Sequence, residues 1–110
     1  MISYKGVHIM LSIRRIQDII IPLARQYGVE RVYLFGSYAR NEQKDTSDVD
    51  LRIDPGDLHG LHFAGFYVDV EERLGCKVDI LTTRQLSDSF LNHIQREEIL
   101  LYDRQKYSAA

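Results

Sequence analysis

A Gly-Ser turn followed by two closely spaced aspartates constrains this chain more than any other feature. Residues 34–40 read LFGSYAR, and residues 47–51 read SDVDL. A glycine lets backbone amides approach phosphate closely, and carboxylates two residues apart can bind one hard cation. The combination indicates a site that handles a nucleoside triphosphate.

The length of the chain limits how much can surround this motif. A chain of 110 residues forms one domain that buries about two-thirds of its unfolded surface, so residues 1–110 are expected to be a single domain. Hydrophobic residues at 45% and charged residues at 27% are typical of a folded chain. Residues 1–9 have no clear pattern and are expected to be a loose extension or an added edge strand, with Met10 as an alternative start.

Charge and cysteine content exclude several classes of partner. The chain has 14 basic and 16 acidic residues, a formal charge of -2, and no basic block. Strong nucleic-acid binding is therefore not expected. One cysteine, Cys76, cannot form an internal disulfide, and no apolar run is long enough to cross a membrane. We expect a cytoplasmic protein without membrane association.

The first helix is predicted at residues 13–27, where apolar residues recur at helical spacing. Ser12 can cap its start and Gly28 can end it. Pro22 lies inside this range and removes one amide donor. We therefore predict a kink at this proline, or a break into two short helices.

The rest of the chain alternates strand and helix patterns. Strands are predicted at residues 32–35, 49–53, 77–81 and 99–102. Helices are predicted at residues 63–74 and 84–94, with Thr82 and Gln85 as a capping box for the second. The first two strands are expected to pair antiparallel. The predicted class is α/β or α+β, with a small mixed sheet of about four strands and helices packed on it.

The candidate site residues follow from this arrangement. On a strand, Asp48 and Asp50 would point to one face, where a cation that takes one or two carboxylates plus phosphates can bind. Asp79, central in the strand at 77–81, is the candidate third acid, because a buried charge there would need a partner.

The phosphate side of the site is predicted next to the first strand. Gly36 and Ser37 follow that strand directly and are expected to hold phosphate, with amides of a helix that starts there. Arg40, about one turn later, can reach the triphosphate or a neighbouring acid. A surface salt bridge is an equally good interpretation of Arg40.

Together these motifs resemble the minimal nucleotidyltransferases of the DNA polymerase β-like superfamily, over most of the chain. The resemblance implies the polymerase β-like nucleotidyltransferase fold and transfer of a nucleoside monophosphate from a triphosphate such as ATP, with two Mg²⁺ ions and release of pyrophosphate. It implies that Asp48 and Asp50 bind the metals and that Gly36 and Ser37 hold the triphosphate. Asp79 would help to bind the catalytic metal and activate the acceptor hydroxyl.

Family members of this size resemble the antitoxin half of a two-gene module. The resemblance implies a partner that is a small helical HEPN ribonuclease toxin, neutralised when AMP is added to a tyrosine hydroxyl. One residue departs from the family pattern: Asn41 stands where many relatives have glycine. Asparagine tolerates left-handed backbone better than most residues, so we expect the turn to survive.

Two other functions stay open at this stage. The chain could be a catalytically silent module that blocks a toxin by contact, or a transferase that acts on a small molecule such as an aminoglycoside. We interpret His59 and His62 as solvent-exposed residues and not as zinc ligands, because two ligands are too few for a zinc site. Tyrosines that could stack on a base are more often used in packing. They are Tyr33, Tyr38 and Tyr67.

Overall fold

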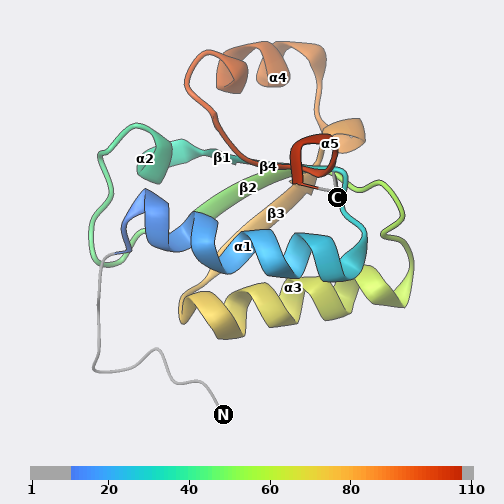
Figure 1. Ribbon diagram of the computed structural model, residues 1–110. Coiled ribbons are helices and arrows are strands. Elements are labelled where there is room, and N and C mark those ends of the chain that lie inside the picture. Colours follow the sequence, from blue (N-terminus) through green and yellow to red (C-terminus); the bar gives the residue numbers. More distant parts are fainter. Residues whose placement is uncertain (1–10, 108–110) are drawn as a thin grey trace.

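The structure, a computed structural model, describes residues 11–107, which form a four-stranded sheet with helices on both faces (Figure 1). The extension predicted at residues 1–9 and the alternative start at Met10 lie outside the described residues. Helices and strands alternate along the chain. The predicted α+β class with a small mixed sheet is confirmed.

The sheet combines antiparallel and parallel pairing. Its strands are β1 (Arg31–Phe35), β2 (Val49–Asp54), β3 (Val78–Thr82) and β4 (Ile99–Asp103). They lie in the order β3-β2-β1-β4. β1 pairs antiparallel with β2, as predicted, and with β4, whereas β2 and β3 run parallel. Parallel neighbours need a crossover, and a helix between β2 and β3 provides it.

Two long helices cover one face of the sheet. The helices are α1 (Ile13–Tyr27), α2 (Gly36–Ala39), α3 (Leu61–Leu74), α4 (Asp88–Gln95) and α5 (Arg104–Tyr107). Figure 1 shows α1 and α3 together under the sheet and α4 on the opposite side. The core lies between the sheet and these two helices. Its fully buried members include Ile16, Ile20, Leu23, Leu34, Leu51, Ile53, Phe66 and Val70.

Strand β2 separates the core from the functional face. Val49, Leu51 and Ile53 are fully buried. Side chains alternate between the faces of a strand, so Asp50 and the other even-numbered residues of β2 belong to the face opposite α1 and α3. Val49 and Leu51 thus lie on the core side of the sheet, and Asp50 lies on the other side.

The predicted break at Pro22 is wrong, because α1 continues through it. Pro22 and Asp18, whose carbonyl would have accepted the missing bond one turn earlier, both lie on the exposed side of the helix. Water can therefore satisfy that carbonyl. The buried side chains of the same helix hold it against the core on the other side.

The helix predicted at residues 84–94 is divided. The Gln85 side chain accepts from the Thr82 amide at 2.9 Å, but this capping box opens only the 3₁₀ helix η1 (Thr83–Gln85). Leu86 is then extended, and Ser87 caps α4 by accepting from the Phe90 amide at 3.2 Å. The cap that starts α4 is thus the serine five residues later. No helix within residues 11–107 has the length and apolarity to span a membrane.

Candidate active site

Two of the three predicted acids face each other across neighbouring strands. Asp50 in β2 is in register with Asp79 in the parallel strand β3. Asp48 lies in the loop immediately before β2 rather than on the strand. The alternation argument therefore applies to Asp50 and Asp79 as register partners, and Asp48 reaches the same end of the sheet from the loop.

The Gly-Ser turn lies directly against Asp50. Gly36 follows β1, where Phe35 is the register partner of Asp50, and has a positive φ of 76°. A β-carbon on Gly36 would collide with the Asp50 carboxylate. Only glycine fits both the left-handed backbone and this close approach. Ser37 comes next, half-buried in the single turn of α2.

The three acids at this end of the sheet have no hydrogen-bond or ion-pair partner among the described residues. Within residues 11–107, none of Asp48, Asp50 and Asp79 accepts a hydrogen bond or forms an ion pair. Burial raises the pKa of Asp50 to about 6, and the negative charges of Asp79 and Asp48 add to this, while Arg40 opposes it. Like charges held close together without a counterion favour a bound cation.

The acids alone do not make a closed metal cage. In the part of the chain that the structure describes, no three His, Cys, Asp or Glu side chains are grouped closely enough to hold a metal ion. Mg²⁺ usually takes one or two protein carboxylates and completes its shell with phosphate oxygens and water. The arrangement around Asp50 therefore fits a metal that arrives with a triphosphate.

Asp79 is exposed, so the expectation that its charge is buried is wrong. β3 is an edge strand, and Val78 and Ile80 on either side of Asp79 take the core-facing positions. The Asp79 side chain thus points to the face that α1 and α3 leave uncovered. Exposure makes this carboxylate accessible to an acceptor group on another molecule.

Arg40 is held by acids of the protein itself. Its Nε donates to Glu42 Oε1 and its Nη1 to Glu97 Oε1, both at 2.9 Å. Of the two interpretations from the sequence, the structure has the ion pair, and phosphate contact stays a prediction. Asn41 follows with a φ of 58°, the left-handed backbone that we expected asparagine to tolerate.

The tyrosines considered for base stacking pack within the protein, and the two histidines considered for zinc binding are exposed. Tyr38 is buried, and Tyr33 lies under the Arg52 guanidinium at 4.0 Å from the ring centre. Tyr67 donates its hydroxyl to the Val78 carbonyl at 2.7 Å. His59 and His62 are exposed, as predicted, with ring centres 6.4 Å apart.

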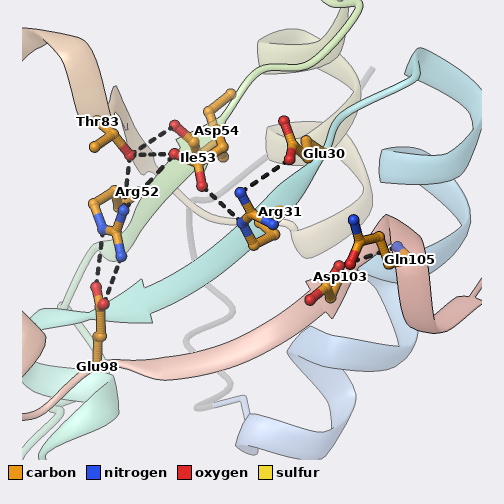
Figure 2. Close-up of polar contacts among 9 residues, drawn as sticks. All are labelled: Glu30, Arg31, Arg52, Ile53, Asp54, Thr83, Glu98, Asp103 and Gln105. Atoms are coloured by element: carbon orange, nitrogen blue, oxygen red, sulfur yellow. Dashed lines mark hydrogen bonds and ion pairs between the residues drawn. The ribbon is translucent and has the colours of Figure 1, made fainter.

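A second charged cluster, the Arg52 network, occupies the same face further along β2 (Figure 2). Arg52 is only 4% exposed and makes a two-pronged pair with Glu98, at 3.0 Å from Nε and 2.5 Å from Nη2. Its Nη1 donates to Thr83 at 2.7 Å, and Thr83 donates to Asp54 at 2.6 Å. Arg31 donates to the same aspartate at 2.9 Å.

In this network each charge has a partner. Burial opposes ionisation of Asp54, but the hydrogen bonds from Thr83 and Arg31 lower its pKa. Sequence reasoning missed the network, because Arg52 and Glu98 are separated by 46 residues. The one local signal was the position of Arg52, between the buried residues Leu51 and Ile53 in a strand pattern.

Comparison with known proteins identifies the family. The sequence profile of the family described as "Polymerase beta, Nucleotidyltransferase" matches residues 17–107. A protein of Methanocaldococcus jannaschii, named as a candidate protein adenylyltransferase, is 38% identical over 90 residues, which cover 81% of this chain and 97% of that protein. The protein adenylyltransferase MntA of Thermococcus cleftensis is 30% identical over 95 residues, or 82% of this chain and 96% of the relative.

A solved structure shares the fold. It is described as a toxin-antitoxin with AMP-PNP, and the similarity has a TM-score of 0.68 at 25% identity. It covers 82% of this chain and 75% of the matched chain.

Proposed function

This chain belongs to the polymerase β-type nucleotidyltransferase family, and we propose that it transfers AMP from ATP to a hydroxyl group of a partner protein, with release of pyrophosphate. The observation that carries the proposal is the register pair of Asp50 and Asp79 beside Gly36. This arrangement puts two carboxylates that have no partner among residues 11–107 next to the Gly36 turn. The names of the two relatives, both protein adenylyltransferases, support AMP as the group transferred.

The residues present suit Mg²⁺ bound together with a triphosphate. The donor set is made of carboxylate oxygens, which Mg²⁺ prefers, and Asp50 carries an elevated pKa that a nearby cation would lower. We assign Asp48 and Asp50 to hold the metal ions, with Asp79 as a further ligand. When bound, Mg²⁺ supplies positive charge that offsets the phosphates and makes a hydroxyl more nucleophilic.

The remaining roles belong to the turn and the edge strand. Gly36 lets the Asp50 carboxylate lie directly against the turn that we assign to hold the phosphates, and Ser37 offers a hydroxyl and an amide as donors. Asp79 is exposed and is assigned to orient the acceptor hydroxyl and take up its proton. Arg40 would reach the triphosphate only by leaving Glu42 and Glu97.

The partner that we propose is a HEPN-class ribonuclease, which would make this chain an antitoxin that modifies a tyrosine of its toxin. The resemblance to minimal nucleotidyltransferases suggested this partner. The similarity to a solved toxin-antitoxin structure with an ATP analogue supports it. The cytoplasm stays the predicted location.

The test is transfer of radiolabel from α-labelled ATP to a HEPN-class protein encoded beside this gene. We expect label on the partner with the natural chain and Mg²⁺, and nearly none with Asp79→Ala. ATP and one metal should still bind that variant, because Asp48, Asp50 and the turn remain. Asp57→Ala is the matched control, since Asp57 is an exposed acid paired with Arg104 away from the site.

Three results would count against parts of this proposal. Full transfer by Asp79→Ala would remove its assigned role. A natural chain that binds and inhibits the partner without labelling it would support the contact-only module. Labelling of an aminoglycoside instead of the protein would make the acceptor a small molecule.

A further inference from the structure

The backbone around Asp79 is held by side chains of α3. In the part of the chain that the structure describes, β3 is an edge strand, so one side of its backbone has no neighbouring strand there. The Tyr67 hydroxyl lies on that side, where it donates to the Val78 carbonyl at 2.7 Å and accepts from the Ile80 amide at 3.4 Å. These two groups belong to the residues immediately before and after Asp79.

A second α3 side chain completes this contact. Glu71, one helical turn after Tyr67, accepts from the Val78 amide through Oε2 at 3.2 Å. Three outward-facing backbone groups of β3 are therefore bound by two side chains of one helix. We call this pair of side chains the α3 clamp.

The clamp can control the direction of the Asp79 carboxylate. On its other side β3 pairs with β2, in the register that brings Asp79 opposite Asp50. The Asp79 side chain has no hydrogen bond or ion pair within residues 11–107, so its position there depends on the backbone of β3. An edge strand held on one side alone twists and frays more easily than a central one.

The surroundings of Tyr67 keep its hydroxyl able to donate. Burial raises the pKa of Tyr67, and the negative charges of Asp79, Glu71 and Asp48 raise it further, against the effect of the Ile80 amide. The phenol therefore stays protonated at neutral pH. The two backbone hydrogen bonds place the Tyr67 hydroxyl beside the residues that flank Asp79, at the end of the sheet that carries Asp48, Asp50 and Asp79, here called the acid end.

We propose that Tyr67 and Glu71 are positioning residues that hold β3 so that the Asp79 carboxylate faces Asp50. This inference rests on the proposed function, in which Asp79 orients the acceptor. If the Asp79 carboxylate samples several rotamers, transfer becomes slower. The binding of ATP is not weakened, because ATP is held by the other acids and the Gly36 turn.

The test uses Tyr67→Phe, which removes the hydroxyl and keeps the ring. We expect kcat for AMP transfer to fall about tenfold while KM for ATP stays within about twofold. A second readout needs no activity: scalar couplings across χ1 of Asp79 should report one rotamer in the natural chain and an average over several in Tyr67→Phe.

Two further comparisons separate positioning from stability. Tyr27→Phe removes a similar phenol bond to α3, the 2.6 Å contact with Asp69, which joins α1 to α3 and does not involve β3. It should lower stability about as much as Tyr67→Phe and leave kcat and the Asp79 rotamer unchanged. Glu71→Gln keeps an oxygen acceptor for the Val78 amide and should retain most activity, whereas Glu71→Ala should behave like Tyr67→Phe.

The proposal is overturned if Tyr67→Phe keeps full kcat and a single Asp79 rotamer, or if Tyr27→Phe loses as much kcat. A natural chain that transfers no AMP would defeat the proposed function alone. The rotamer measurement would then still decide whether the clamp fixes Asp79.

Discussion

The two ends of strand β2 carry carboxylates in opposite electrostatic conditions. Asp50 and Asp54 lie on the same face of the same strand, four residues apart. At one end, burial and neighbouring acids raise the pKa of Asp50 to about 6. At the other, hydrogen bonds from Thr83 and Arg31 outweigh burial and lower the pKa of Asp54.

The difference lies in where the compensating charge comes from. The Arg52 network supplies its own cations, and Figure 2 shows each acid of that cluster facing an arginine or a hydroxyl. The acid end holds like charges with no cation of its own in contact within residues 11–107. In the proposed function, the acids Asp48, Asp50 and Asp79 receive a charge brought by the ligand, whereas the Arg52 network needs none.

The largest expected effect tests the acid end. Asp48→Asn and Asp50→Asn keep side-chain size but remove the charge that the metals need. AMP transfer should fall on the order of a thousandfold, with an unchanged circular dichroism spectrum. Turnover near that of the natural chain would show that Asp48 and Asp50 are not needed to bind the metals. Unfolding of the variants would instead show a structural role for these acids.

The next effect tests the Arg52 network. Arg52→Ala leaves the Glu98 carboxylate, which is 8% exposed, buried without its partner. The free energy of unfolding in urea should fall by about 3 kcal/mol, as expected when one member of a buried pair is removed. Arg31→Ala, which removes a half-exposed arginine of the same cluster, is the matched control. It should cost less than about 1 kcal/mol. Equal losses would mean that burial of the pair is not decisive.

The contrast can be sharpened by pH. Asp50 has a folded pKa of about 6 against an ordinary 3.8, so the native state holds this proton more tightly than the unfolded state. Ionisation of Asp50 therefore lowers stability as pH rises from about 4 to about 6.

Without metal, Asp50→Asn should accordingly be more stable than the natural chain above about pH 6. The gain should be about 1 kcal/mol once solvent screening of this half-buried group is allowed for, and should vanish below about pH 4. Thermal unfolding in EDTA across this range measures it. A gain that grows toward low pH would have the wrong sign.

The smallest effect on stability concerns Arg40. This residue forms ion pairs with Glu42 and Glu97 and also lowers the pKa of Asp50. Its ion pair with Glu97 is 40% and 23% exposed, so Arg40→Ala should change the free energy of unfolding very little. If Arg40 moves to the triphosphate, the same variant should raise KM for ATP about tenfold. Glu97→Gln, which removes one of the two ion pairs that hold Arg40, should not raise it. An unchanged KM in Arg40→Ala would leave the residue as a surface ion pair.

The parts of the fold with local signals were predictable. Ser12 accepts from the Arg15 amide at 3.0 Å and Gly28 ends α1 in left-handed backbone, as the sequence pattern predicted. Asn41 takes the backbone expected for a replacement of glycine. Such features depend on residues within one or two turns, which the sequence displays directly.

Features that depend on distant partners were not predictable. The prediction of a break at Pro22 is wrong because packing of the buried face of α1 outweighs one missing hydrogen bond. The exposure of Asp79 follows from β3 being an edge strand, which the pattern of residues 77–81 does not reveal. The clamp by Tyr67 bridges α3 and β3, and apolar periodicity alone would class that tyrosine as core packing.

Calorimetric titration of ATP into the natural chain, once with Mg²⁺ and once with EDTA, tests the central claim most directly. If the acid end binds a cation together with the triphosphate, ATP should bind in the presence of Mg²⁺ and show no measurable binding in EDTA. Without the metal, the phosphates and the acids Asp48 and Asp50 repel each other. Equal affinity in both titrations would contradict the account, since the triphosphate would then be held without the metal that these acids are proposed to bind.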